Sequence, residues 1–219
     1  MTRPRARRRG AQPTKTAKRA PEAPAAGDES PRERLLDAAE RLLVTVGHDR
    51  ITTRALGEEA GLNHGLVHYY YGSMEELFLA VLERFTARLI VRQRAMYAAE
   101  GPFLSKWRTA MDFLDQDLAS GYPKVYFELQ AMAWNRPAMR ARLEALHGEW
   151  RKVLTEALTK ALERYGMDAS PARVAAWVAL ITTFNSGIFI ERLGGVKHGH
   201  AELLEMIDEW LRSLEKRVR

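Results

Sequence analysis

The sequence predicts an all-α protein in which a three-helix unit containing a helix-turn-helix precedes a larger helical domain. Between Thr52 and Leu77, two short helical patterns are joined by a very tight turn. From Pro102 onward, apolar residues recur at helical spacing between Gly and Pro breaks, and no segment keeps the alternation of a β-strand. We expect a basic tail, a helix-turn-helix domain and a second helical domain over residues 1–29, 30–76 and 77–219.

The N-terminal segment carries the excess positive charge of the chain. Eight of the 34 Lys and Arg residues lie among the first 20 residues, which contain no Asp or Glu. The remainder has 26 basic against 28 acidic residues. Because Pro, Ala and Gly separate these charges without apolar periodicity, we predict a disordered tail. It is either a solubilising extension or an arm that contacts nucleic-acid phosphates or a minor groove.

The first ordered helix is predicted to begin at Ser30, which suits an N-cap because Pro31 follows it and Glu33 lies three residues later. Gly47 is predicted to end this helix. Its apolar positions at helical spacing are Leu35, Ala38, Ala39, Leu42, Leu43 and Val46.

The tight turn after the second helix depends on two glycines. Gly57 permits a close approach between the two helices of the motif, and Gly61 suits the left-handed conformation that ends the first of them. Asn63 is predicted to cap the next helix, which we expect from about His64 to Tyr70. This helix is too short to be a core element, and it resembles a recognition helix in a DNA major groove.

The run AGLNHGLVHYYYGSMEEL, in which Ser73 and Glu76 form a capping box, closely resembles the signature of the TetR family of bacterial transcriptional regulators. The resemblance covers Arg32 to about Leu82. Two positions differ, because His68 and Met74 stand where the family usually has a Tyr and a Lys that contact phosphate. The resemblance implies DNA contacts at Thr53, Arg54, Asn63, His64, Gly65, His68, Tyr69 and Tyr70.

Leu77 to Leu89 begin a long fourth helix, whose start is expected to pack on the DNA-binding unit and whose remainder enters the second domain. This helix is therefore placed to act as a lever between them. The second domain is rich in aromatic residues and Met, which form either ordinary core or an adaptable cavity. The resemblance implies a pocket for a small, largely apolar effector there. The candidate lining residues are Trp107, Met111, Tyr126, Phe127, Gln130, Trp134 and Asn185.

The segment Val174 to Leu193 is apolar on more than one face, and the last helix carries an amphipathic stripe. We predict that both pair with the same surface of a second chain in a two-fold homodimer. A self-contained bundle is the alternative. The predicted interface residues are Trp177, Ile181, Phe184, Ile188, Ile207, Trp210 and Leu211.

Other chemistry finds little support in the sequence. His64 and His68 have the i, i+4 spacing of two metal ligands but lack a third, so we expect no metal and no cofactor. No Walker loop, dinucleotide fingerprint or nucleophile elbow is present, so we expect no enzyme. The absence of Cys fits a cytoplasmic location. No run approaches twenty uninterrupted apolar residues, so we expect a soluble protein.

The sequence therefore favours a sequence-specific, DNA-binding transcriptional regulator with a pseudo-palindromic operator. It is predicted to be a repressor that leaves its operator when an effector binds. A structural protein that binds DNA largely without sequence preference is the alternative.

Overall fold

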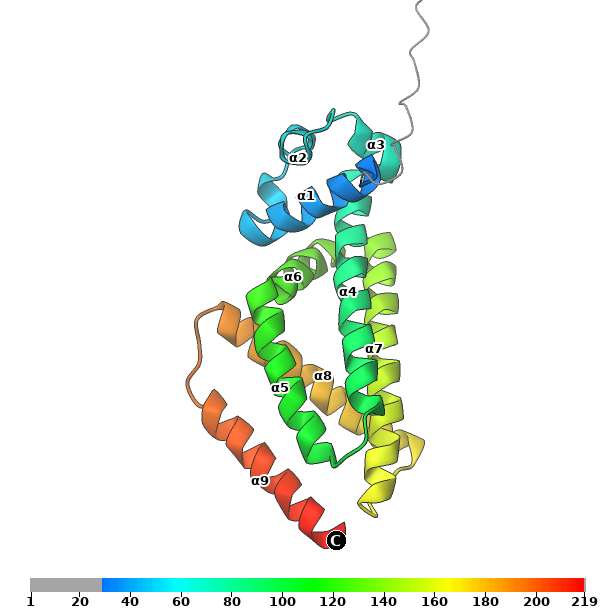
Figure 1. Cartoon of the computed structure of the whole chain (residues 1–219), viewed down its shortest axis with the longest axis vertical. Coiled ribbons are helices and arrows are strands. Elements are labelled where there is room, and N and C mark those ends of the chain that lie inside the picture. Colours follow the sequence, from blue (N-terminus) through cyan, green and yellow to red (C-terminus); the bar gives the residue numbers. More distant parts are fainter. Residues whose placement is uncertain (1–28, 219) are drawn as a thin grey trace, which may run out of the picture. The chain divides into compact units, whose positions relative to one another are not determined.

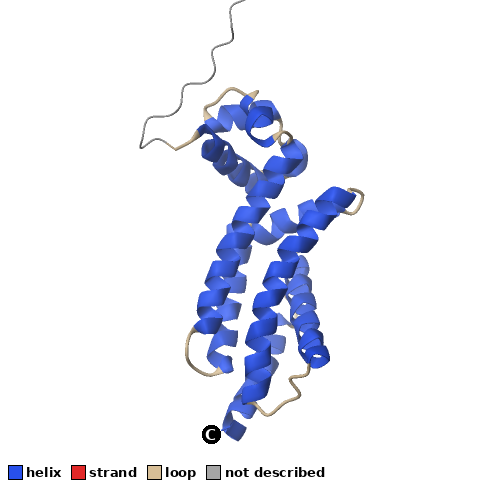
Figure 2. Ribbon diagram, turned by 90° about the vertical axis from the view of Figure 1, so that its right-hand side faces the viewer, coloured by secondary structure: helices blue, strands red, loops and turns tan. Residues whose placement is uncertain are grey.

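The computed structural model describes residues 29–218, so the predicted basic tail lies outside the described residues. Within this range the chain is helical and contains no strand (Figures 1 and 2). The helices are α1 (Pro31–Thr45), the short 3-10 helix η1 (His48–Arg50), α2 (Thr53–Ala60), α3 (Leu66–Tyr71), α4 (Met74–Ala98), α5 (Phe103–Ser120), α6 (Tyr122–Ala133), α7 (Pro137–Arg164), α8 (Pro171–Leu193) and α9 (His200–Val218).

The turn between α2 and α3 has the backbone that its glycines predict. Gly61 ends α2 in the left-handed conformation with φ 63°. A Cβ atom on Gly57 would lie 2.8 Å from the Leu62 carbonyl oxygen and 3.0 Å from the His64 nitrogen. The backbone of the turn therefore passes directly over Gly57, and no other residue fits there without moving it.

The recognition helix α3 is shorter than predicted. It begins at Leu66 rather than His64, and Gly65 occupies the N-cap without a side-chain hydrogen bond. The Asn63 side chain instead accepts a hydrogen bond at 2.8 Å from the Gly65 backbone N–H. This two-residue side-chain turn stabilises the loop before the helix, so His64 and Gly65 lie in the turn and not in the first helical turn.

The core of the helix-turn-helix unit continues into the second half of the chain. Leu35, Leu56 and Val67 from α1, α2 and α3 belong to the same buried cluster as Val125 and Leu129 from α6. Residues 31–219 also form a single compact unit by their contacts. The boundary expected at residue 76 falls within α4, which runs through both parts (Figure 1).

The C-terminal helices pack differently from one another. α8 packs mainly against α7, whereas α9 packs mainly against α5. By length and composition, α8 is the one described helix apolar enough to cross a membrane, although Thr182, Asn185 and Ser186 interrupt its apolar sequence. Only part of its surface is covered within the chain, which leaves apolar side chains exposed on its outer side.

Candidate DNA-contacting surface and internal cavity

The predicted DNA-contacting residues share one exposed end of the helix-turn-helix unit. Six of the eight are exposed, and Thr53 and Tyr70 are half-buried. Tyr69 is the most prominent aromatic residue, with 69% of its surface exposed. Tyr70 packs against the core and meets the Tyr69 ring edge to face, with 4.9 Å between ring centroids. The core therefore supports a surface that is free to contact a ligand as large as DNA.

Local hydrogen bonds orient two of these side chains. His68 Nδ1 lies 3.0 Å from the carbonyl oxygen of Gly72 at the end of α3, so a proton on Nδ1 is donated along the helix and Nε2 remains free. Arg54 Nε donates to Glu58 Oε1 at 2.9 Å, in an exposed pair one turn apart in α2. Only Nε of the guanidinium is used in this pair, so its two terminal nitrogens can still donate to a phosphate.

Two neighbouring residues have structural roles. Tyr71 donates a hydrogen bond from its hydroxyl to the Arg32 carbonyl at 2.8 Å, and the Arg32 guanidinium lies 5.0 Å from the centre of its ring. Met74 packs against the core of the helix-turn-helix unit. An apolar side chain at this position therefore adds packing in place of the phosphate contact of the usual Lys.

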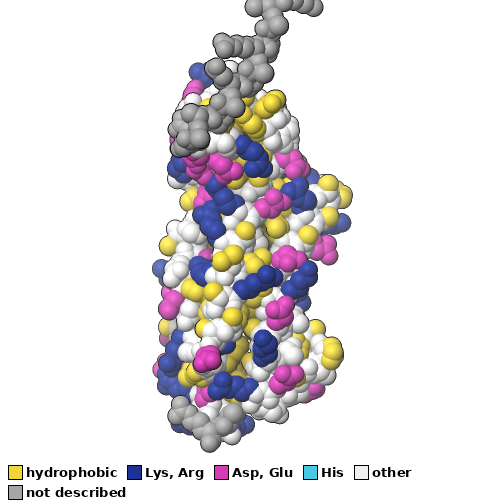
Figure 3. Space-filling model, turned by 45° about the vertical axis from the view of Figure 1, so that its right-hand side comes forward, with side chains coloured by type: hydrophobic (Ala, Val, Ile, Leu, Met, Phe, Trp, Pro, Cys, Tyr) yellow, Lys and Arg dark blue, Asp and Glu magenta, His cyan; other side chains and the backbone are white. Residues whose placement is uncertain are grey.

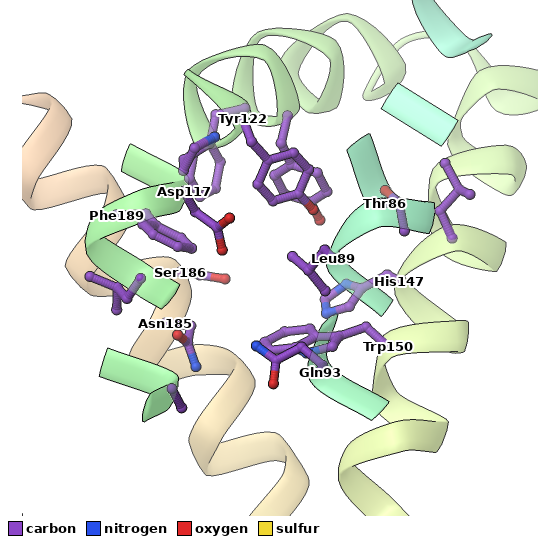
Figure 4. A pocket seen from close by; sticks show the side chains of 16 residues that line it. Thr86, Leu89, Gln93, Asp117, Tyr122, His147, Trp150, Asn185, Ser186 and Phe189 are labelled. Carbon is purple, nitrogen blue, oxygen red and sulfur yellow. The ribbon is translucent and has the colours of Figure 1, made fainter. Parts of the chain in front are cut away.

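A small internal cavity lies among α4, α5, α6, α7 and α8, with a volume of about 70 Å³ (Figure 4). In this view Tyr122 and Asp117 lie at one end, and Gln93 and Trp150 lie at the other. Aromatic rings form much of its wall: His147 stacks on Trp150 with centroids 5.9 Å apart and planes 20° apart. The cavity thus combines flat apolar walls with a few polar groups, as ligand sites in proteins commonly do.

The charged groups of the cavity largely cancel. The Arg92 guanidinium donates to both carboxylate oxygens of Asp117 at 2.8 Å and stacks over the Phe113 ring at 4.1 Å. Burial raises the pKa of Asp117, and Arg92 opposes this shift by stabilising the carboxylate. Burial lowers the pKa of His147, and the charge of Arg151 lowers it further, so the imidazole is neutral at pH 7.

Two buried polar atoms of the cavity lining have no hydrogen-bond partner. These are Gln93 Oε1, an acceptor, and Trp150 Nε1, a donor. Gln93 as a whole is only 7% exposed. Buried polar atoms are usually paired, and an unpaired one calls for an explanation such as a missing ligand or water.

The structure gathers only some of the predicted ligand residues around this cavity. Tyr126, Phe127 and Asn185 line it. Trp107 lies instead beside Phe184 in a separate hollow, with ring centroids 5.9 Å apart. Gln130 lines a shallow recess beyond Tyr126, and Met111 lies on the half-buried side of α5. Trp134, at the end of α6, is 67% exposed and lies away from the cavity.

Sequence reasoning missed the polar part of the cavity. The missed lining residues with polar atoms are Thr86, Gln93, Asp117, His147 and Ser186. One signal was present, because Gln93 follows Leu89 by four residues and so interrupts the apolar stripe of α4.

The predicted dimer residues mostly line the second hollow, an apolar space of about 340 Å³ between α5, α7, α8 and α9. Trp177 stacks on Trp210 there, with centroids 5.6 Å apart. Ile188 and Leu211 are buried within the chain itself, so they offer no surface to a second chain in this conformation. The remaining predicted residues that line the hollow are Ile181, Phe184 and Ile207.

The helix α6 joins the cavity to the DNA-binding unit. Its Tyr122 and Tyr126 side chains line the cavity. Elsewhere on the helix, Lys124 Nζ donates to the Val44 carbonyl at the end of α1 at 2.8 Å. A Cβ atom on Gly121 would lie 2.7 Å from a Val44 methyl carbon, so the start of α6 is pressed against α1. A displaced cavity wall would therefore move against the helix-turn-helix unit.

Comparison with known proteins agrees with this architecture. Residues 35–81 match the profile of the bacterial regulatory proteins of the tetR family. The chain is 26% identical over 195 residues to the HTH-type transcriptional repressor AcnR from Corynebacterium glutamicum, covering 86% of this chain and 97% of AcnR.

Two solved structures share the fold. The transcriptional regulator FadR from Bacillus subtilis, in complex with stearoyl-CoA, superimposes with a TM-score of 0.67 at 14% identity, over 82% of this chain and 96% of FadR. The multidrug binding protein EbrR, complexed with imidazole, gives a TM-score of 0.59 at 22% identity, over 85% of this chain and 96% of EbrR. Residues 35–81, from α1 to α4, thus match the TetR family of bacterial transcriptional regulators, and the chain is similar to the repressor AcnR along most of its length.

Proposed function

We propose that this protein is a transcriptional repressor that binds an operator through its helix-turn-helix and leaves it when a small effector enters the cavity between α4 and α8. The observation that carries this proposal is the position of α6, which lines the cavity and contacts the end of α1. The similarity to the repressor AcnR supports repression over activation.

A homodimer is part of the proposal. Leu180 and Ile190 on α8 are 58% and 55% exposed, and Met206 on α9 is also largely exposed. An apolar surface of this kind is best covered by another chain. Gly187, on the same side of α8, has nothing within 4 Å of the Cβ position, so a second helix has room to approach closely there. Two-fold pairing would place two recognition helices in successive major grooves.

The helix-turn-helix surface reads DNA in this proposal. We assign Asn63, His64 and Gly65 to base edges, and Thr53, Arg54, His68 and Tyr70 to the DNA backbone. On the face drawn in Figure 3, basic and acidic side chains are interspersed. Beyond the first 20 residues the chain has 26 basic and 28 acidic residues, so DNA binding by the helix-turn-helix depends more on the shape and hydrogen-bonding groups of its surface than on a broad positive field. We also assign the protein to the cytoplasm, where the DNA is.

The effector acts by linkage. A compound that binds better when α6 is displaced from α1 lowers the affinity of the protein for its operator. By linkage, bound operator DNA lowers the affinity of the protein for the compound by the same factor. The cavity volume of about 70 Å³ favours a small effector. Imidazole, with which EbrR is complexed, is closer to this size than the stearoyl-CoA bound by FadR.

A competition experiment tests the DNA-binding part of the proposal. Operators are selected from random DNA, and a defined pseudo-palindrome is then challenged with excess random DNA. A repressor retains the pseudo-palindrome. If random DNA displaces the pseudo-palindrome in proportion to the mass of random DNA added, the protein is a structural DNA-binding protein and the proposal is wrong.

A further inference from the structure

We propose that the internal cavity binds a compact, uncharged, planar compound that presents one hydrogen-bond donor and one acceptor to Gln93 and Trp150. This inference rests on the proposed function, because it specifies the chemistry of the effector for the same cavity. It follows from the size, the charge and the unpaired atoms of the cavity.

The size of the cavity limits the ligand. At about 70 Å³ it has roughly half the volume of the engineered cavity of about 150 Å³ that binds benzene. A ligand that enters without large rearrangement is therefore smaller than benzene. The stacked rings of His147 and Trp150, 20° from parallel, give the cavity a flat wall, which favours a planar molecule.

The charge balance of the cavity selects an uncharged ligand. The Asp117 carboxylate is already paired with the Arg92 guanidinium at 2.8 Å. Burial lowers the pKa of His147, so it adds no charge at neutral pH. An ionic ligand would lose its hydration without gaining a free counter-ion, which disfavours its entry.

The unpaired atoms define the polar groups of the ligand. Gln93 Oε1 on α4 is an acceptor and Trp150 Nε1 on α7 is a donor, and neither has a hydrogen-bond partner within the protein. A ligand with an N–H or O–H group satisfies Gln93, and one with a lone pair satisfies Trp150. Binding of such a ligand removes the free-energy cost of leaving Gln93 Oε1 and Trp150 Nε1 unpaired. These two hydrogen bonds are therefore the main source of specificity.

Pyrazole is a suitable probe because it is flat, neutral, smaller than benzene, and carries an N–H donor beside an acceptor nitrogen. Binding to the full-length dimer is measured by calorimetry and by tryptophan fluorescence. We expect saturable binding of pyrazole and at least tenfold weaker binding of 1-methylpyrazole, which lacks the donor. Acetate and formamidinium, which carry opposite charges, should not bind. Equal binding of a charged compound, or of the methylated one, overturns the proposal.

Two conservative variants locate the site. Gln93→Leu removes the acceptor and Trp150→Phe removes the donor but keeps an aromatic ring, so each should weaken pyrazole binding at least tenfold. Trp134→Phe, at an exposed tryptophan outside the cavity, is the matched control and should bind as the parent does.

Thermal unfolding shows that weaker binding is not caused by misfolding. Because Gln93→Leu replaces an unpaired polar group by an apolar one of similar volume, we expect the ligand-free variant to have a Tm at or above that of the parent. Unchanged binding in Gln93→Leu and Trp150→Phe would refute the proposal. If pyrazole binds as expected but leaves operator affinity unchanged, the ligand class stands and the proposed regulation fails.

Discussion

Glu128 on α6 holds His48 of the helix-turn-helix unit through two contacts, although 80 positions separate these residues. The His48 backbone N–H donates to Glu128 Oε2 at 2.9 Å, and His48 Nδ1 lies 3.0 Å from the same oxygen. Because a carboxylate only accepts, Nδ1 is the protonated nitrogen of this contact. The pair fixes η1, and with it the start of α2, against the helix that lines the cavity.

Replacing Glu128 should therefore destabilise the protein. Glu128→Ala leaves the half-buried His48 N–H without its acceptor, so we expect the free energy of unfolding to fall by about 1–3 kcal/mol in urea titrations. Glu128→Gln keeps an acceptor for the backbone N–H and should lose less. Glu156→Ala, at an exposed carboxylate of α7, is the control and should change little. If Glu128→Ala and Glu128→Gln lower the free energy of unfolding equally, the stabilisation comes from the charge of Glu128 and not from the backbone hydrogen bond.

Gly57 gives a second prediction because its Cβ position is occupied by backbone. The atoms 2.8 Å and 3.0 Å away belong to Leu62 and His64, so Gly57→Ala must displace the turn that carries the DNA-contacting surface. We expect loss of operator binding together with a destabilisation of more than about 1 kcal/mol. Gly148→Ala is the matched control: this helical glycine has nothing within 4 Å of the Cβ position, so alanine should stabilise by about 0.5–1 kcal/mol.

The sequence predicted correctly those features that depend on only one or two neighbouring residues. The left-handed Gly61 that ends α2 and the Ser73 cap at the start of α4 both depend on the backbone of one or two residues, and the structure confirms them. The start of α3 was wrong by two residues because the Asn63 side chain supports a turn as readily as a helix.

The cavity was harder to predict because it depends on rotation about whole helices. α8 is apolar around much of its circumference, so its periodicity does not reveal which side faces Trp107 and which side is exposed. Gln93 and Asp117 lie on amphipathic helices, where a polar residue is usually on the solvent side. Only the packing of five helices places both in the wall of the same cavity.

The dimer surface is tested by a charge on the exposed side of α8. Ile190→Glu would bury an unpaired carboxylate twice at a two-fold interface, at a cost of about 3–5 kcal/mol for each. We expect monomers by light scattering and loss of cooperative operator binding, with the helical content retained because Ile190 is exposed in the single chain. Val91→Glu, at an exposed apolar residue of α4, should remain dimeric. A dimeric Ile190→Glu protein would place the interface elsewhere.

The half-buried His147 predicts how the free energy of unfolding depends on pH. Its pKa is lowered from 6.5 in the folded protein, first by burial and then by Arg151. The unfolded state therefore binds a proton more readily, and the free energy of unfolding should decrease as pH falls below about 6.5. The raised pKa of Asp117 acts in the opposite direction, because above pH 3.8 the folded state holds this proton more readily than the unfolded state, and it offsets part of the effect. Urea titrations at pH values from 5 to 8 should show that the free energy of unfolding depends less steeply on pH in His147→Gln than in the parent.

The last prediction concerns Met74, which packs at the start of α4 where related regulators usually have a phosphate-contacting Lys. Lys has a long aliphatic stem that can occupy the same apolar surface while its ammonium group reaches solvent. Met74→Lys should therefore fold, restore one phosphate contact and tighten binding to operator and random DNA alike. Each phosphate neutralised steepens the plot of log affinity against log salt by about 0.9, so fluorescence anisotropy over a salt series should show this increment. Met74→Leu, which preserves packing without charge, should keep the parent slope. If Met74→Lys also keeps that slope, the start of α4 does not approach the phosphates, and the backbone contacts of this protein lie elsewhere on the surface around Arg54 and Tyr70.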